Sequence, residues 1–171
     1  MALSWVGVTR SGVAGAVCLW VSACGEPVRT DAALIEELRF NRAGFEEAIQ
    51  VACETPAITD FELRSGQPPE TRPASLDPIR VQSLRTFMEK HAVSRAYFEC
   101  GSPVVASFDV ASVGLGVSGQ SKKLMFSPGG VPESFGGPLV ADTDAAIAAG
   151  NGKSVTVHRD IGDGWFIRNS N

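Results

Sequence analysis

Basic residues are few in this sequence and are nowhere clustered. The 171 residues contain 15 Lys and Arg against 19 Asp and Glu, which gives a formal net charge of −4, and the longest basic run is Lys122-Lys123. Proteins that bind nucleic acid through its phosphates present a basic patch or stripe, so we expect no nucleic-acid partner. The acidic balance also argues against electrostatic docking on anionic lipid headgroups.

Histidine is scarce as well, which limits the metal and acid–base chemistry that the chain can carry. His91 and His158 are the only histidines. Neither belongs to a spaced set of zinc ligands. We therefore expect His91 at a helix end and His158 in a strand, with no zinc site.

Two segments approach known ligand loops without completing them. Gly114 to Ser121 reads GLGVSGQS, but Gln120 occupies the position of the lysine that a phosphate-binding loop requires. Asp142 and Asp144 do not continue into the ligand series of a calcium loop. A glycine-rich connection and a helix cap are the expected roles, and we predict neither a metal nor a cofactor.

The N-terminal segment has the order of an export signal. Arg10 is the only charged residue among residues 1–23, and Ser11 to Val21 form a small, apolar run. That run is about half of the ~20 residues that a membrane-spanning helix needs. Small residues precede the expected cleavage point, as in export signals. We therefore predict a signal that is removed, not a permanent transmembrane helix.

Val21-Ser22-Ala23-Cys24 closes this segment and resembles the lipobox of bacterial lipoproteins. In that motif a branched apolar residue and two small residues precede a cysteine. The resemblance implies cleavage before Cys24, a diacylglycerol on its thiol and an acylated amino terminus. It implies an envelope protein held to a membrane by lipid and facing the periplasm. Gly25 after the cysteine favours the outer membrane of a Gram-negative host. An ordinary secretory signal cut near Ala23 is the alternative.

Removal of residues 1–23 would leave one domain of usual size. The remaining 148 residues carry a formal charge of −5, because Arg10 leaves with the signal. Residues 24–30 form a short tether, and residues 31–171 form a single domain. The extended tether reaches at most roughly 20 Å, so the domain would lie close to the bilayer.

The remaining cysteines predict a disulfide. Cys18 leaves with the signal and Cys24 carries the lipid, so Cys53 and Cys100 remain. Two thiols in an exported protein are typical of one disulfide. Closing this loop of 48 residues stabilises by roughly 4 kcal/mol in the chain-entropy description. Two buried free thiols are the alternative.

Two helices are predicted in the first half of the domain. Thr30 or Asp31 caps the first, and apolar residues recur at helical spacing until about Cys53. Asp77 and Pro78 open the second helix as its cap and first residue. We expect the buried side of the second helix to comprise Ile79, Leu84, Phe87, Met88 and His91.

The second half has the alternation of strands. The chain takes on β character from Ala96, and the apolar residues at even positions from Val104 to Val110 predict a strand with one strongly apolar face. After Ser112 the apolar residues lie at odd positions, which predicts a bulge near Ala111-Ser112. The other expected elements are strands at 57–63, 122–127, 154–160 and 165–168, loops at 65–75 and 129–138, and a short helix at 142–149. This order predicts an α+β fold, with two or three helices packed on an antiparallel sheet of about four or five strands.

The last two strands form a predicted hairpin with a glycine-rich turn. Regular pairing places Phe166 and Val157 on the face toward the core, and Trp165, Ile167 and His158 on the other face. Tryptophan beside polar groups is a common interface anchor. Trp165, His158 and Ile167 are therefore a candidate interaction face, and a sheet covered on both sides is the alternative.

These patterns identify no catalytic residue. We therefore expect a non-enzymatic binding module, held at a membrane by its lipid, with an envelope protein as partner. One alternative is an envelope hydrolase in which Asp160 orients His158 as a general base. Another is a protein that neutralises a toxic enzyme.

Replacement of Cys24 by Ser tests the predicted anchor. The variant lacks the thiol that accepts the lipid, so it is expected to take up no fatty-acid analogue and to remain uncleaved or become soluble. Metabolic labelling and membrane fractionation measure both properties, and the parent protein is expected in the labelled membrane fraction. Equal membrane association of the two proteins, both unlabelled, would contradict the lipid anchor.

Overall fold

The computed structural model describes residues 28–113, 119–150 and 153–171. The export signal, Cys24 and most of the tether lie outside the described residues, as do residues 114–118 of the glycine-rich segment. Within the described ranges, no helix is both long enough and apolar enough to cross a membrane. The fold described below is therefore that of the predicted domain, residues 31–171.

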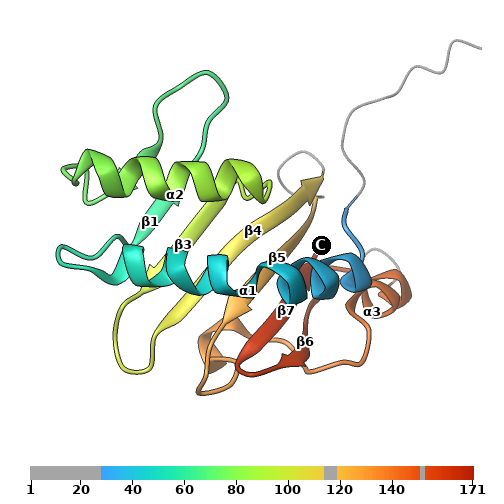
Figure 1. Cartoon of the computed structure of the whole chain (residues 1–171). Helices are drawn as coiled ribbons and strands as arrows, with labels where there is room; N and C mark the ends of the chain where they lie inside the picture. Colours follow the sequence, from blue (N-terminus) through green and yellow to red (C-terminus); the bar gives the residue numbers. More distant parts are fainter. Residues whose placement is uncertain (1–27, 114–118, 151–152) are drawn as a thin grey trace, which may run out of the picture.

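Three α-helices and seven strands make up the described part of the chain (Figure 1). The helices are α1 (Asp31–Cys53), α2 (Pro78–Lys90) and α3 (Thr143–Ala149), and a short 3₁₀ helix, η2, spans Glu133–Phe135. The strands are β1 (Asp60–Glu62), β2 (Glu70–Arg72), β3 (Arg95–Glu99), β4 (Val105–Val113), β5 (Gln120–Phe126), β6 (Thr156–Gly162) and β7 (Trp165–Ser170).

The strands form one antiparallel sheet in the order β2-β1-β3-β4-β5-β7-β6. The two long helices, α1 and α2, lie across the same face of this sheet (Figure 1). The predicted α+β class is confirmed, although the sheet has more strands than expected. The difference arises partly at β2, a three-residue strand between prolines in the segment that we predicted as a loop.

The three α-helices begin at predicted caps. The side-chain oxygens of Thr30, Asp77 and Asp142 accept backbone N–H bonds of 3.2, 2.9 and 2.8 Å at the starts of α1, α2 and α3. Each bond satisfies one of the N–H groups that the first helical turn leaves without a partner.

Arg80 connects α2 to the end of α1. The prediction that Ile79 is buried is wrong, because Ile79 is 75% exposed and the neighbouring Arg80 faces α1 instead. Leu84, Met88 and His91 are buried as predicted. The Arg80 guanidinium donates to the carbonyls of Val51 (2.7 Å), Ala52 (3.3 Å), Glu54 (3.0 Å) and Pro56 (3.0 Å). A buried arginine thus satisfies carbonyl groups at the C-terminal end of α1.

The predicted disulfide between Cys53 and Cys100 is present. Cys53 is the last residue of α1, Cys100 follows β3, and their Cα atoms are 5.3 Å apart. The bridge therefore joins the C-terminal end of α1 to the C-terminal end of β3, beside the contacts of Arg80.

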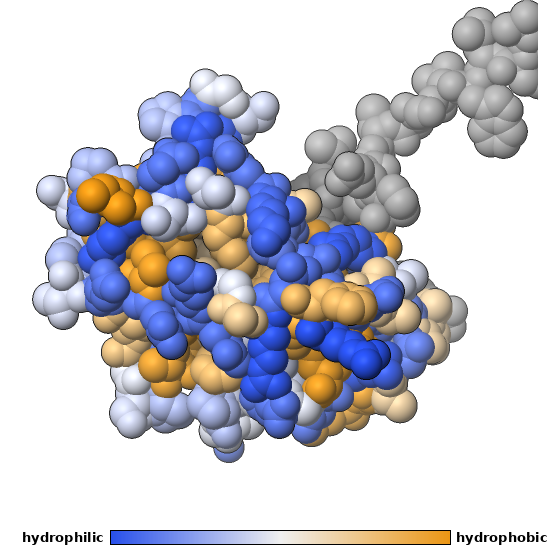
Figure 2. All heavy atoms as spheres, in the orientation of Figure 1, coloured by the Kyte–Doolittle hydropathy of each residue, from blue (hydrophilic) through white to orange (hydrophobic). Residues whose placement is uncertain are grey.

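An aromatic cluster lies between the helices and the sheet. Phe45 of α1 contacts Phe108 of β4 and Trp165 of β7, with ring centroids 5.2 and 5.9 Å apart. All three side chains are fully buried. Figure 2 shows the outer side of the helices, where polar residues surround small apolar patches.

A bulge in the C-terminal hairpin corrects the predicted faces. The turn residues Asp163 and Gly164 both have positive φ, as a two-residue type I′ turn requires. Gly162 then pairs with Trp165, but Asp160 pairs with Phe166, so Ile161 is an extra residue. The insertion reverses the side-chain alternation for the rest of β6.

Consequently, the predicted interaction face of Trp165, Ile167 and His158 is not formed. Trp165 and Ile167 are fully buried beneath the helices. His158 lies on the opposite face, paired with Arg168. The one bulge that we predicted, in β4, is present, but its register shift lies between Asp109 and Ala111, slightly before the predicted position.

Truncation of Trp165 tests its corrected position. Trp165→Ala is expected to lower the free energy of unfolding by about 3–5 kcal/mol, because it empties a site in the core. Phe40→Ala is a matched aromatic control on α1, where Phe40 is 73% exposed, and it is expected to change stability by less than about 0.5 kcal/mol. Denaturant unfolding measures both values. A similar small effect for the two variants would contradict a buried Trp165.

Candidate functional site

The face of the sheet opposite the helices is only partly covered. Side chains alternate along the strands, so the residues that flank the buried Phe98 and Phe108 point to this second face. Tyr97 lies there, 40% exposed, and its hydroxyl donates to Glu99 over 3.1 Å. That hydrogen bond raises the pKa of the Tyr97 phenol, so the group remains a neutral donor.

Strand register aligns ionisable side chains across this face. One cross-strand row runs from β2 to β6 through every strand of the sheet. We call it the charge row, and its members in spatial order are Glu70, Glu62, Arg95, Asp109, Lys123, Arg168 and His158. Neighbouring positions in such a row lie close enough for their side chains to interact.

Most charges in the row have a partner of opposite sign. Arg95 forms two hydrogen bonds with Asp60 (2.9 and 2.5 Å), which raise the pKa of its guanidinium. Lys123 lies 2.7 Å from Asp109. Arg64 bridges the two acids at the β2 end of the row, Glu62 (3.1 Å) and Glu70 (2.6 Å). These pairs are partly exposed, so each contributes little to stability.

Arg168 is the exception. It forms no ion pair within the described ranges, and its Nε is buried without a hydrogen-bond partner. Its guanidinium lies 5.5 Å from the centre of the Phe135 ring in a cation–π contact. A cavity of about 230 Å³ opens beside it, lined by Arg95, Tyr97, Ser107, Asp109, Lys123, Phe135 and Arg168. A cation and two aromatic rings therefore face a common hollow.

The segment between β5 and α3 covers the other end of the face. His158 N–H donates to the Pro138 carbonyl (2.9 Å), and its own carbonyl accepts from Val140 N–H (2.7 Å). Gly137, at φ +86, lies so close to β6 that a Cβ atom would be 2.2 Å from the Thr156 carbonyl oxygen. Phe166 is buried on this face although it points away from the helices. The segment thus closes the β7–β6 end and leaves the β1–β4 end open.

His158 does not form the predicted catalytic pair. Its Nε2 donates to the Gly136 carbonyl (2.6 Å), and burial lowers the pKa of the ring, so the imidazole is neutral. The Asp160 carboxylate accepts instead from Gly162 N–H (2.8 Å). The contact on which the hydrolase alternative depends is therefore not made.

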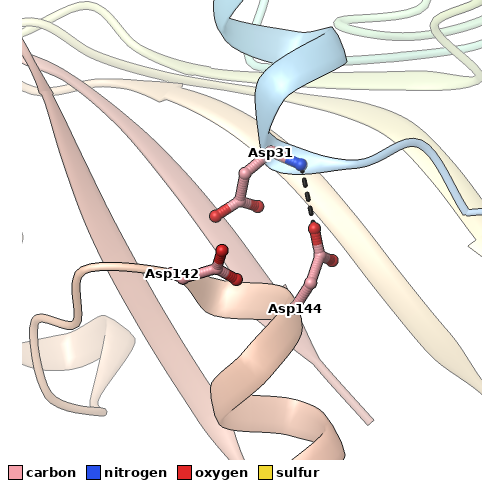
Figure 3. Close-up of side chains that lie close together, drawn as sticks. All are labelled: Asp31, Asp142 and Asp144. Carbon is pink, nitrogen blue, oxygen red and sulfur yellow. Dashed lines mark hydrogen bonds between the residues drawn. The ribbon is translucent and has the colours of Figure 1, made fainter.

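A second ionisable cluster lies on the helix side, where α1 and α3 begin (Figure 3). Oxygens of Asp31, Asp142 and Asp144 lie within 4.8 Å of one another, a spacing compatible with a metal ion. However, the fully buried Lys122 ammonium forms ion pairs with Asp31 (2.9 Å) and Asp144. A divalent cation would have to displace this ammonium, so the arrangement is that of an internal ion network.

Asp31 is the most connected member of the network. Its carboxylate accepts from Thr143 N–H (2.8 Å) and Oγ1 (2.5 Å) and pairs with Arg159 (3.3 Å). Burial opposes ionisation, but the hydrogen bonds from Thr143 and Lys122 outweigh it, and the pKa of Asp31 lies below its ordinary 3.8. Asp31 is therefore a carboxylate in the folded protein at all but strongly acidic pH.

A third candidate, between α1 and α2, is a groove of about 220 Å³ that His91 lines. Glu37 accepts from His91 Nδ1 over 2.5 Å. Arg29 pairs with the same carboxylate at 3.4 Å. The contact fixes the orientation of the ring and joins the end of α2 to α1, as a structural histidine does.

Sequence reasoning missed both the charge row and the buried lysine. The row depends on strand register, which no local pattern specifies. Lys122 had one available signal, since it shares strand parity with Leu124 on the core face. One of the two adjacent lysines therefore had to point inward.

Comparison of the chain with protein-family models, curated protein sequences and solved structures finds no match.

Substitution of Asp31 tests the ion network. Asp31→Asn is expected to lower the free energy of unfolding at pH 7 by about 3 kcal/mol or more, because the buried Lys122 loses one of its two counter-charges. Since folding lowers the pKa of Asp31, its contribution is complete above pH 3.8 and is lost as pH falls through the folded-state value. The difference in unfolding free energy between the parent and Asp31→Asn should therefore become smaller in strong acid.

Asp142→Asn is the matched control, because Asp142 is exposed and Asn also serves as a helix cap. It is expected to leave stability nearly unchanged. Denaturant unfolding at neutral pH and below about pH 3 measures all three proteins. A gap that stays constant across this range would contradict the role of the Asp31 charge.

Proposed function

We propose that this chain is a lipid-anchored, non-enzymatic binding module of the bacterial envelope, and that the open face around Tyr97 is its binding surface. The main support for this binding surface is the charge row, which presents both signs of charge beside an exposed aromatic ring. Complementary charges give specificity to protein interfaces, and Tyr and Arg are enriched among their energetic anchors.

The proposed anchor is supported by the lipobox-like Val21 to Cys24 and by the thiol chemistry. Cys53 and Cys100 form a disulfide, as is usual outside the cytoplasm. The tether would enter the domain at Asp31, which Lys122 and Thr143 hold in place. Because the tether would be short and would join the domain at the firmly held Asp31, it would keep the domain near the membrane surface.

The non-enzymatic reading is supported by the states of the candidate residues. His158 is buried and bonded to a backbone carbonyl, and both described cysteines are oxidised. The cavity beside Arg168 is lined by ion pairs and aromatic rings, a composition suited to recognition of charged and polar groups. A partner protein of mixed charge fits this surface.

Site-specific photo-crosslinking tests the surface in native membranes. A photoreactive phenylalanine analogue at Tyr97 is expected to give a discrete crosslinked product with the partner. The same analogue at Phe40 is the control, because Phe40 is exposed on the helix side. Blotting for the chain detects the product. Equal crosslinking at the two positions, or none at Tyr97, would contradict the open face as binding surface.

A further inference from the structure

We propose that the partner of the open face is a second copy of this chain, stacked face to face about a two-fold axis parallel to the strands. This inference rests on the proposed binding surface and names its occupant. The axis would pass between β3 and β4, at the centre of the six charged positions that run from β2 to β7.

The sign order of the charge row carries the inference. From Glu70 to Arg168 the charges are negative, negative, positive, negative, positive and positive, and His158 beyond them is neutral. Read in reverse, every position has the opposite sign. A two-fold axis parallel to the strands reverses the order of the strands in the second copy, so the row of one copy faces the row of the other in the opposite order. It therefore places Glu70 on Arg168, Glu62 on Lys123 and Arg95 on Asp109 of the other copy.

The row also contains two like-charged neighbours that one copy does not fully compensate. Lys123 and Arg168 are directly cross-strand, and like charges in that position destabilise a sheet. Lys123 forms an ion pair with Asp109, but Arg168 has no acidic partner within the described ranges. Glu70 of a second copy would supply one. Its side chain is 57% exposed and thus accessible to a partner.

The hollow and the covered parts of the open face are also arranged as this symmetry requires. A hollow of about 520 Å³ lies over the β1–β2 end, lined by residues that include Asp60, Glu62 and Arg72. The segment carrying η2 covers the opposite end, over β7 and β6. In the proposed arrangement β7 of one copy lies over β2 of the other, so covered and hollow ends meet.

The axis direction also suits two chains anchored in one membrane. Rotation about an axis parallel to the strands keeps corresponding strand ends on the same side. Asp31 contacts Lys122 near the start of β5 and, through Thr143, Asn169 near the end of β7. Both tethers would therefore leave the dimer at the same end.

The contact area indicates a weak dimer that depends on the anchor. Six strands at ~4.8 Å spacing and about 17 Å long give a footprint of roughly 500 Å² per copy. That value is below the ~800 Å² per partner of a standard stable interface. Two chains confined to one membrane have a raised effective concentration, which compensates for low affinity. Partly exposed ion pairs also make such a dimer sensitive to salt.

Charge reversal on the lipidated, full mature chain tests the pairing. Donor-tagged and acceptor-tagged copies are placed in neutral phosphatidylcholine vesicles, and energy transfer between them measures association. Glu62→Lys alone and Lys123→Glu alone are each expected to reduce association about tenfold or more, because each puts like charges together at both symmetric contacts. A mixture of the two variants restores both contacts and is expected to recover parental transfer.

Glu89→Lys and Lys90→Glu on α2 are the matched charge-reversal controls on the helix side, and neither is expected to change energy transfer. Denaturation midpoints of all variants establish that they fold. No transfer for the parent, or no recovery in the mixed sample, overturns the second copy as partner. A Tyr97 crosslink to a protein of different mass would also overturn it and leave the proposed binding surface standing. If the parent shows no energy transfer and the Tyr97 analogue gives no crosslinked product, both the second copy as partner and the proposed binding surface are contradicted.

Discussion

The buried ammonium of Lys122 is the constraint on which the packing of this domain depends. It lies in the sheet at β5 and is paired with acids at the first turn of α1 and of α3. A buried ion pair adds little net stability, because desolvation offsets the attraction. Separating its members is costly, however, since an uncompensated charge would remain inside the protein. The network therefore favours the one arrangement of α1, α3 and the sheet in which Lys122 is neutralised.

The other end of α1 is fixed by different chemistry. There the disulfide joins Cys53 to Cys100, and the Arg80 guanidinium satisfies the last carbonyls of the helix. Between these ends, Phe45 packs on Phe108 and Trp165. A helix held at both ends and in its middle cannot slide on the sheet. The geometry of the opposite face is therefore set before any partner arrives, which lowers the entropic cost of binding.

The sequence predicted what local chemistry determines. The caps at Thr30, Asp77 and Asp142 and the pairing of Cys53 with Cys100 follow from residue type and order along the chain. The hairpin faces were wrong because a single extra residue, Ile161, reverses the alternation. Register and bulges depend on how strands distant in sequence meet, and no local pattern contains that information. The charge row, the ion network of Asp31 with Lys122 and the open face around Tyr97 all belong to this second kind.

The pattern of the charge row matters more than its net charge. Six charged positions that sum to zero produce a weak field at long range, so steering toward a partner is slight. At contact distance the same row is selective. If the proposed copies slipped by one strand in one direction, Arg95 would lie on Arg95 and Glu62 on Asp109. Most contacts would then join like charges, whereas the central register joins opposite charges at every position. Register-dependent repulsion of this kind excludes alternatives that attraction alone would permit, and it also discourages the unspecific stacking to which an open sheet face is prone.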